Sequence, residues 1–272
     1  MTKIAILGAG GRMGRMLVRC VAEAEDLTLI GALERADYHR LGADAGRLAG
    51  VGETGIHIGS DPAAAAAEAD VLVDFSFHTA APEHAVAAAA LGTPLVSGVT
   101  GLSEEEEAAI AGAAERIPVV RAPNMSLGMN LLFAMVRRAA QTLDEAYDVE
   151  IVETHHRLKK DAPSGTALRL GEQAAAARGQ DFEAAAVHGR EGMPGERPRG
   201  QIGIHAVRGG SVVGEHTVRF LADSEELFLG HRAASREAFA TGALHAARWL
   251  VGRKPGLYDM QDVLGLRARE AS

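Results

Sequence analysis

Residues 3–14, Lys3-Ile4-Ala5-Ile6-Leu7-Gly8-Ala9-Gly10-Gly11-Arg12-Met13-Gly14, decide the fold of the N-terminal half of the chain. The run that begins at Lys3 is short and apolar up to Leu7, as in a strand that is buried on both faces of a parallel sheet. Glycines follow at once, and a helical pattern begins at Met13. This strand–turn–helix order is typical of a site where backbone N–H groups and a helix N-terminus hold the pyrophosphate of a dinucleotide.

The glycines of this turn depart from the usual G-x-G-x-x-G spacing, because the third glycine, Gly14, arrives one position late. The next expected strand, 27–33, is followed by Glu34 and Arg35. An acid at this place accepts hydrogen bonds from ribose hydroxyls, whereas a neighbouring arginine can face a 2′-phosphate. The pair predicts a site that tolerates both NADH and NADPH; the alternative is a plain helix-start turn with both side chains solvated.

Strands and helices then alternate to about residue 125, which is the pattern of a doubly wound α/β sheet. Ligands of such sheets bind in the crevice outside the carboxyl ends of the strands. The segments Gly98-Val99-Thr100 and Ala122-Pro123-Asn124-Met125 follow two such ends, although each could also be an ordinary loop. Strands are expected at 70–76, 94–97 and 118–121, and helices at 79–91 and after a capping box formed by Ser103 and Glu106.

The pattern changes near residue 126, where we place a domain boundary. Strands linked by tight turns dominate the later part, and three successive hairpin-linked strands predict an antiparallel or mixed sheet. The Gly-, Pro- and Arg-rich segment 188–201 is expected to be a long loop, either a lid or slack chain. Helices are expected at 127–143, 167–178 and 235–251, and strands at 147–154, 202–208, 211–221 and 225–232.

A second informative stretch, His155-His156-Arg157-Leu158-Lys159-Lys160-Asp161-Ala162-Pro163-Ser164-Gly165-Thr166-Ala167, combines imidazoles, cations and a helix start. The strand period places Glu153 and His155 on one face and His156 on the other, if the strand persists. Adjacent histidines that point apart do not share a metal, no third ligand is evident, and we expect no metal site. One imidazole could donate a proton near neutral pH, although a lone histidine is more often structural.

The helix start in this stretch offers a place for an anion. Ser164 is a good N-cap, and Gly165 and Thr166 would then present N–H groups at the positive end of a helix, which suits a carboxylate. Lys159 adds a fixed cation. Lys160 is better explained as a solvated charge. These features predict a site for a small substrate that carries two negative charges.

Composition narrows the class of protein. The formal net charge of −8 and the pI near 5.8 argue against a general binder of nucleic acid or membrane surfaces, so neither is expected as a partner. One cysteine, Cys20, excludes an internal disulfide framework. No apolar run reaches the roughly 18 residues that a membrane span needs, and no signal-peptide pattern precedes Lys3, so the expected localisation is cytoplasmic.

The 155–167 stretch closely resembles the signature of the 4-hydroxy-tetrahydrodipicolinate reductase family, long called dihydrodipicolinate reductase, of lysine and diaminopimelate biosynthesis. The glycine turn 8–14 is similar to that of the family, as are the segments 98–101, 202–210 and 214–217. The resemblance spans essentially the full chain. It implies reduction of 4-hydroxy-tetrahydrodipicolinate, a small dicarboxylate, to tetrahydrodipicolinate with loss of water, and NADH and/or NADPH as the cofactor.

The resemblance also implies the architecture and the roles of residues. It implies a Rossmann-type doubly wound parallel sheet at 1–126, completed by 236–272, and an α+β substrate-binding and oligomerisation domain with a mixed sheet at 127–235, assembled as a homotetramer. His155 would be the proton donor and Lys159 its catalytic partner. The substrate would be held by His156, Gly165 and Thr166. NAD(P)H would be bound by Gly8, Ala9, Gly10, Gly11, Arg12, Met13, Glu34, Arg35, Gly98, Val99, Thr100, Ala122, Pro123, Asn124 and Met125.

The sequence departs from the family pattern at two places, and two alternative functions remain open. Leu158 stands where many family members carry a polar residue, and Pro123 and Met125 vary around a fixed Asn124. Another two-domain dehydrogenase, acting on aspartate or diaminopimelate, would explain the glycine turn but not the histidine–lysine cluster. A nicotinamide-dependent regulator would keep the first site and would not need an acid beside the nicotinamide.

Overall fold

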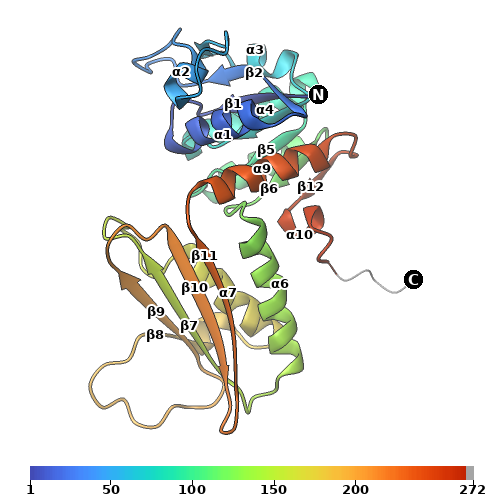
Figure 1. Cartoon of the computed structure of the whole chain (residues 1–272). Coiled ribbons are helices and arrows are strands. Elements are labelled where there is room, and N and C mark those ends of the chain that lie inside the picture. Colours follow the sequence, from blue (N-terminus) through green and yellow to red (C-terminus); the bar gives the residue numbers. More distant parts are fainter. Residues whose placement is uncertain (268–272) are drawn as a thin grey trace. The chain divides into compact units, whose positions relative to one another are not determined.

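The computed structural model describes residues 1–267, so the last five residues of the expected C-terminal segment 236–272 lie outside the described part. The chain divides into two compact units (Figure 1). The first comprises Met1–Leu127 together with the segment from Arg236 onward, and the second comprises Gly128–Ser235. Among the described residues, no helix is long and apolar enough to cross a membrane.

The first unit is built on a seven-stranded parallel sheet with the order β12-β6-β5-β4-β1-β2-β3. The order reverses between β1 and β4, so the carboxyl ends of these two strands form the switch point at which α/β sheets bind ligands. The strands are β1 (Thr2–Leu7), β2 (Leu27–Leu33), β3 (Ile58–Gly59), β4 (Val71–Asp74), β5 (Leu95–Ser97), β6 (Pro118–Arg121) and β12 (Gly256–Tyr258).

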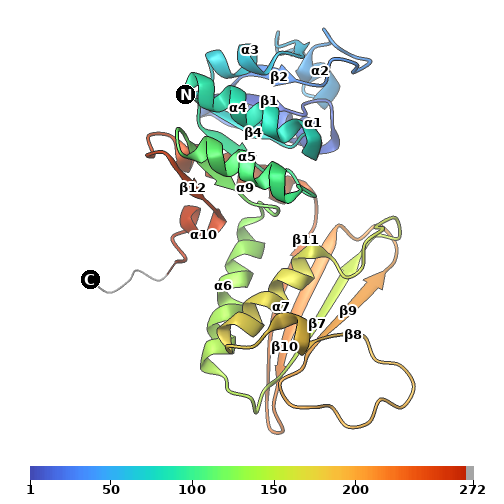
Figure 2. The same cartoon turned by 180° about the vertical axis from the view of Figure 1, so that it is seen from behind.

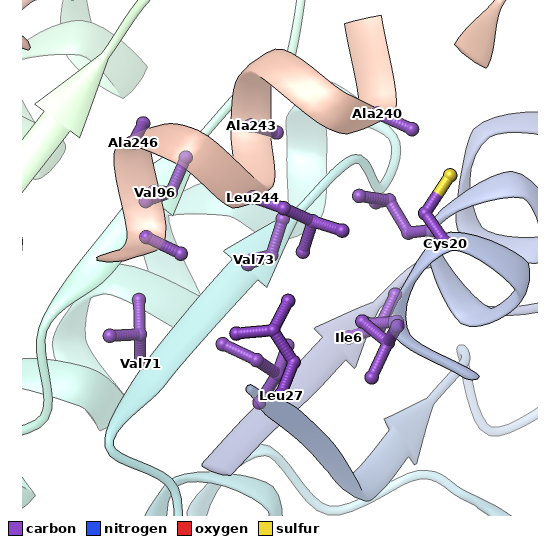
Figure 3. Close-up of a cluster of buried hydrophobic side chains, with 14 of the residues drawn as sticks. Ile6, Cys20, Leu27, Val71, Val73, Val96, Ala240, Ala243, Leu244 and Ala246 are labelled. Carbon is purple, nitrogen blue, oxygen red and sulfur yellow. The ribbon is translucent and has the colours of Figure 1, made fainter. Parts of the chain in front are cut away.

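Helices cover both faces of this sheet, which explains why its strands read as continuous apolar runs. On one face α1 (Arg12–Glu23) and α9 (Glu237–Leu250) pack on Ile6, Val73 and other strand residues, as Figure 3 shows. The C-terminal helix α9 thereby completes the core of the N-terminal sheet. The other face is covered by α3 (Pro62–Ala67), α4 (Ala81–Leu91) and α5 (Glu104–Ala114), and α2 (Ala45–Ala49) joins the first cluster.

The second unit contains a five-stranded mixed sheet with the order β11-β10-β7-β9-β8. The expectation of three successive hairpin-linked strands is wrong for β9, which pairs in parallel with β7 and not with β10. The N–H of Gly209 donates to the carbonyl of His155 at 3.0 Å, so the Gly209-Gly210 turn crosses the end of β7. The strands are β7 (Asp148–His155), β8 (Ala186–His188), β9 (Ile202–Arg208), β10 (Gly214–Leu221) and β11 (Glu226–Ala233).

Two long helices, α6 (Leu127–Thr142) and α7 (Gly165–Ala177), cover one face of the mixed sheet (Figures 1 and 2). Val149, Ile151 and Glu153 of β7 point to this face and are buried. The opposite face carries Phe228, which is 70% exposed. Short elements that the sequence did not predict complete the fold: α2, β3, α3, α8 (Phe182–Ala185), β8, β12 and α10 (Met260–Val263), as well as a 3₁₀ turn at His78–Ala80.

Candidate functional site

The glycine turn occupies the switch point of the parallel sheet. Gly8 has a φ of +80°, and a Cβ placed on it would lie 2.9 Å from the backbone of Phe75 and Ser76, just beyond β4. A side chain at residue 8 would therefore be strained and would also collide with the neighbouring strand end. Glycine is required here because the β1 turn passes directly over the end of β4.

Gly14, the third glycine of the turn, still allows helix α1 to pack closely against the end of strand β1. A Cβ on Gly14 would lie 2.1 Å from the carbonyl oxygen of Gly8, so only a glycine lets α1 start this close to the turn. The N-cap of α1 is Gly11, which makes no side-chain cap hydrogen bond. The first N–H groups of the helix, at Arg12 and Met13, therefore receive no N-cap side chain, and a helix start of this kind suits an external anion, as in dinucleotide sites.

Glu34 lies beside the same turn, where its carboxylate accepts a hydrogen bond from the N–H of Gly10 at 2.9 Å. The neighbouring Arg35 forms an ion pair with Asp37 at 3.0 Å, and both side chains are about three-quarters exposed. Tyr38, which the sequence did not single out, covers Gly10: a Cβ on that glycine would lie 2.3 Å from the Tyr38 hydroxyl. The acid, the arginine and an aromatic ring are therefore gathered around the turn.

The other two predicted cofactor segments lie at the same edge of the sheet. The N–H of Gly98 donates to the carbonyl of Asp74 at 2.9 Å, and that of Ala122 donates to Ser97 at 3.1 Å, so each segment abuts the neighbouring strand end. Within these segments the buried residues are Val99, Ala122 and Met125, and the exposed ones are Thr100 and Pro123. The side-chain oxygen of Asn124 accepts a hydrogen bond from the N–H of Ser126 at 3.0 Å. The Rossmann fold, the backbone cradle and the uncapped helix fit a bound dinucleotide.

In the second unit, His155 is the last residue of β7 and shares its face with Glu153, as the strand period predicted. Glu153 is fully buried, and its Oε2 lies 2.6 Å from Nδ1 of His155. Arg208, at the end of β9, donates to both carboxylate oxygens at 2.7 Å, and the N–H of Ser164 donates to Oε1 at 2.9 Å. The carboxylate therefore holds together two strand ends and the start of α7.

The electrostatics of Glu153 and His155 follow from burial and from these partners. Burial acts to raise the pKa of Glu153, but Arg208, His155 and the Ser164 N–H together lower it below its ordinary value. Burial lowers the pKa of His155; Lys159 and Arg208 act in the same direction, and Glu153 opposes them. His155 is thus a stronger acid than a free imidazole, and the hydrogen bonds of residues 1–267 engage its Nδ1 and not its Nε2.

His216, on β10, packs edge-on against His155 with ring centroids 5.2 Å apart. Its Nε2 lies 3.1 Å from Oγ of Ser164, which in turn caps α7 by accepting the N–H of Ala167 at 3.2 Å. Burial lowers the pKa of His216 to about 4, so the ring is neutral at physiological pH. A neutral imidazole at this place packs against His155 without adding a second positive charge.

Lys159 lies in the loop between β7 and α7, and its ammonium group forms an ion pair with Asp161 at 2.7 Å. The same loop is tied to the buried network, because Arg208 also donates to the carbonyl of Asp161 at 2.7 Å. Hydrogen bonds therefore connect His155 to Lys159 through Glu153, Arg208 and Asp161. The lysine is partly buried and the aspartate is largely exposed, so the cation is held at the surface of the site.

The remaining predicted substrate residues also lie at this end of β7. His156 follows the end of the strand, so the prediction of opposite faces does not extend to it, and its Nδ1 is buried without a hydrogen-bond partner among residues 1–267. Gly165 and Thr166 open α7 as predicted, after the Ser164 cap. In the described part of the chain, no group of three or more His, Cys, Asp or Glu side chains is placed to hold a metal ion.

Sequence reasoning assigned no role to the groups that organise this site, namely Glu153, Asp161, Arg208 and His216. A signal for Glu153 was present, because a carboxylate in a buried strand position two residues before a histidine must have partners. Which arginine would pair with it depends on the parallel pairing of β7 with β9, which the sequence did not predict. The assembled site offers an oriented imidazole, a fixed cation and a helix N-terminus, which together suit proton donation to a bound anion.

Comparisons with known families agree with this architecture. The family model of the N-terminus of dihydrodipicolinate reductase matches residues 2–125, and that of its C-terminus matches residues 128–264. A 4-hydroxy-tetrahydrodipicolinate reductase of Anaeromyxobacter dehalogenans (strain 2CP-C) is 52% identical over 267 residues, 98% of this chain and 99% of the relative. The enzyme of the same name from Nitrosomonas europaea is 51% identical, over 97% of this chain and 98% of its own.

Solved structures share the fold. A dipicolinate-bound dihydrodipicolinate reductase from Paenisporosarcina sp. TG-14 superposes with a TM-score of 0.76 at 23% identity, over 96% of this chain and 98% of that one. An amine dehydrogenase from Mycobacterium smegmatis gives a TM-score of 0.62 at 14% identity, over 98% and 97% of the two chains. Matches to both family models, and relatives more than half identical over nearly the whole chain, establish that this chain belongs to the dihydrodipicolinate reductase family.

Proposed function

We propose that this chain catalyses the NAD(P)H-dependent reduction of 4-hydroxy-tetrahydrodipicolinate to tetrahydrodipicolinate in lysine and diaminopimelate biosynthesis. The ring loses water and gains a hydride at C4 of the resulting C=C–C=N system, and a proton neutralises the charge that develops. The observation that carries the proposal is the buried Glu153–His155 pair beside Lys159 and the start of α7. Membership of the family and relatives of that name support it.

The first unit would hold NADH and/or NADPH. The N–H groups at the start of α1 and the glycine turn would receive the pyrophosphate, with Gly98–Thr100 and Ala122–Met125 lining the rest of the crevice. Glu34 would accept hydrogen bonds from the ribose hydroxyls, and Arg35 would turn from Asp37 to a 2′-phosphate, which the exposure of both side chains allows. When bound, the reduced nicotinamide supplies the hydride.

The second unit would hold the dicarboxylate substrate. The N–H of Gly165 at the start of α7, Thr166 beside it, and the Nδ1 of His156, which has no hydrogen-bond partner among residues 1–267, would contact one carboxylate. The ammonium group of Lys159 would exchange its ion pair with Asp161 for an ion pair with a carboxylate oxygen of the substrate. His155 would donate the proton from Nε2, and the carboxylates of the substrate would favour the protonated imidazole that burial alone disfavours.

We further propose that the chain assembles as a homotetramer through the uncovered face of its mixed sheet. That face has a shallow depression lined by Val152, Thr217, Arg219, Glu226 and Phe228. Phe228 is 70% exposed, and an aromatic side chain that exposed on an open sheet is stabilised when a second sheet covers it.

The test is a coupled assay. Pyruvate and aspartate semialdehyde, with the synthase that condenses them, generate the unstable substrate in place, and the loss of NADH or NADPH absorbance is followed. Decay that requires both the synthase and this protein is the expected result. No decay with either cofactor would contradict the proposal and would leave a dehydrogenase of another amino acid, or a nicotinamide-dependent regulator, as the explanation.

A further inference from the structure

The buried carboxylate of Glu153 has more donors than a structural residue needs. Both of its oxygens are used twice: Oε1 accepts from Ser164 and Arg208, and Oε2 accepts from Arg208 and faces His155. The side chain is fully buried in β7, where an unpaired charge would be strongly unfavourable. Arg208 and Ser164 alone would satisfy that charge, so the contact with His155 calls for a separate explanation.

The contact constrains which nitrogen of His155 carries a proton. An ionised carboxylate only accepts hydrogen bonds, so at 2.6 Å the Nδ1 atom must be the donor. In the neutral ring Nε2 then carries no proton, and in the imidazolium Nε2–H is the one that can be given away. The ring is also fixed in orientation, because Nδ1 is tied to its own strand and His216 packs against its side.

Charged and titratable groups surround His155 from every element near it. Glu153 lies on the same strand, Arg208 comes from the end of β9, and Lys159 and Asp161 come from the loop that follows β7. His216 comes from β10, and His231 of β11 acts on His216. Glu153 is the one anion in direct contact with the ring among these, and Arg208 competes with the ring for the same Oε2.

From this geometry we infer that Glu153 is a positioning residue that fixes the proton on Nδ1 of His155, and that Arg208 limits how strongly Glu153 stabilises the imidazolium. In this inference Glu153 and Arg208 act through His155, which Glu153 contacts directly and Arg208 reaches through Glu153. The inference rests on the proposed role of His155 as proton donor. It adds that the acid strength of His155 is set by Glu153, whose carboxylate interacts with both His155 and Arg208.

The test uses two substitutions whose effects have opposite signs. Glu153→Gln removes the anion, so the pKa of His155 is expected to fall by about 1 unit, the lower end for the loss of a contacting charge. Arg208→Gln removes a cation and frees Oε2, so the same pKa is expected to rise by about 1 unit. The measurement is an NMR titration of substrate-free protein labelled at histidine Cε1, with the His155 signal assigned by its loss in His155→Gln.

Imidazole ¹⁵N shifts supply a second readout. At high pH the wild-type His155 is expected to carry its proton on Nδ1, and this preference is expected to be lost in Glu153→Gln. A purely structural role predicts loss of stability in both variants with no shift of the His155 midpoint. An unmoved midpoint, or movement in the same direction in both variants, overturns the inference. If one variant does not fold, the sign of the shift in the other decides.

A matched control lies on the same strand. Glu150 also binds arginines, Arg190 and Arg197, and His205, but on the opposite face of the sheet. Glu150→Gln is expected to disturb a comparable ion cluster and to leave the His155 titration unchanged. The titration does not require enzyme activity. It therefore tests the role of Glu153 independently of the proposed reductase function. An inactive protein with shifted midpoints contradicts the proposed function, and an active one with fixed midpoints contradicts this inference.

Discussion

Arg35 is the residue that should distinguish the two nicotinamide cofactors. In the described structure its guanidinium pairs with Asp37 at the surface, and a 2′-phosphate would offer a stronger, bidentate partner. Arg35→Ala is expected to weaken NADPH binding by about 10-fold or more while NADH binding changes little. Kd values for both cofactors, measured by titration calorimetry, check this. Equal losses for the two would refute a 2′-phosphate contact, and Asp37→Asn, which keeps the arginine, is the control.

His216 should make the fold sensitive to acid. Its pKa is about 4 in the folded chain, against an ordinary value of 6.5, so as pH falls from 6.5 towards 4 the unfolded chain takes up the proton first. The contribution of neutral His216 to the free energy of unfolding is therefore fully present above pH 6.5. It is lost as the pH falls from 6.5 to 4, by roughly 3 kcal/mol in total. His216→Gln is expected to remove this component. Urea unfolding at pH 7 and pH 4.5 checks it; equal losses in both proteins would contradict the prediction.

The limits of sequence reasoning are clear at the scale of residues. The functional roles of His155, Lys159 and Ser164 were predicted from the motif, because all three residues lie within the single stretch 155–167. Glu153 was placed on the correct face by strand periodicity but had no partner assigned. Arg208 lies 55 positions away along the chain from Glu153, and that pairing follows from three-dimensional register and not from any local pattern.

The glycine turn is the element whose geometry tolerates change least. A Cβ on Gly14 would lie 2.1 Å from a backbone oxygen, so Gly14→Ala must shift either the turn or α1. We expect a loss of about 1–3 kcal/mol in stability and cofactor binding weakened by about 10-fold. Thermal unfolding and NADH titration are the measurements.

Gly112 in α5 is the matched control for this change. It is also a helical glycine, but a Cβ there would meet nothing within 4 Å. Gly112→Ala is expected to raise stability by about 0.5–1 kcal/mol and to leave cofactor binding unchanged. Similar effects of the two substitutions would show that the close approach of α1 to the turn is unimportant.

Elements differ in how well the sequence predicted them. The long helices and the buried strands were found because apolar periodicity and caps such as Ser103 and Ser164 are local signals. The strands β3 and β12 have two and three residues, too few for any periodicity, and they exist because a neighbouring strand supplies their hydrogen bonds. The β9–β10 turn was read correctly as a reversal, but the insertion of β7 between these strands depends on tertiary packing.

At the scale of the whole molecule, the uncovered face of the mixed sheet predicts an assembly. If that face mediates the proposed homotetramer, Phe228→Asp should place a charge in the interface and yield smaller species. Light scattering coupled to size-exclusion chromatography checks the mass. Val86→Asp, at a valine that is 63% exposed on α4 in the first unit, is the control and should leave the mass unchanged. A tetramer that persists in Phe228→Asp would exclude this face as the interface.

The molecule as a whole is organised so that the C-terminal segment returns to the first sheet. α9 packs against β4 and β5, and β12 pairs in parallel with β6, so the first unit is built from both ends of the chain. Composition and local patterns gave no sign of this return. It entered the sequence analysis only through the resemblance to a known family, because pairing between residues far apart in sequence leaves no local mark.

The central claim is that His155 gives the proton that completes reduction, and it is tested most directly by the kcat of His155→Gln in the coupled assay. The expected result is a kcat at least ~10² below wild type, with unchanged thermal unfolding and cofactor binding. Lys159→Ala is expected to give a loss of similar size. A near-wild-type rate in His155→Gln would contradict the assignment of His155 as the proton donor.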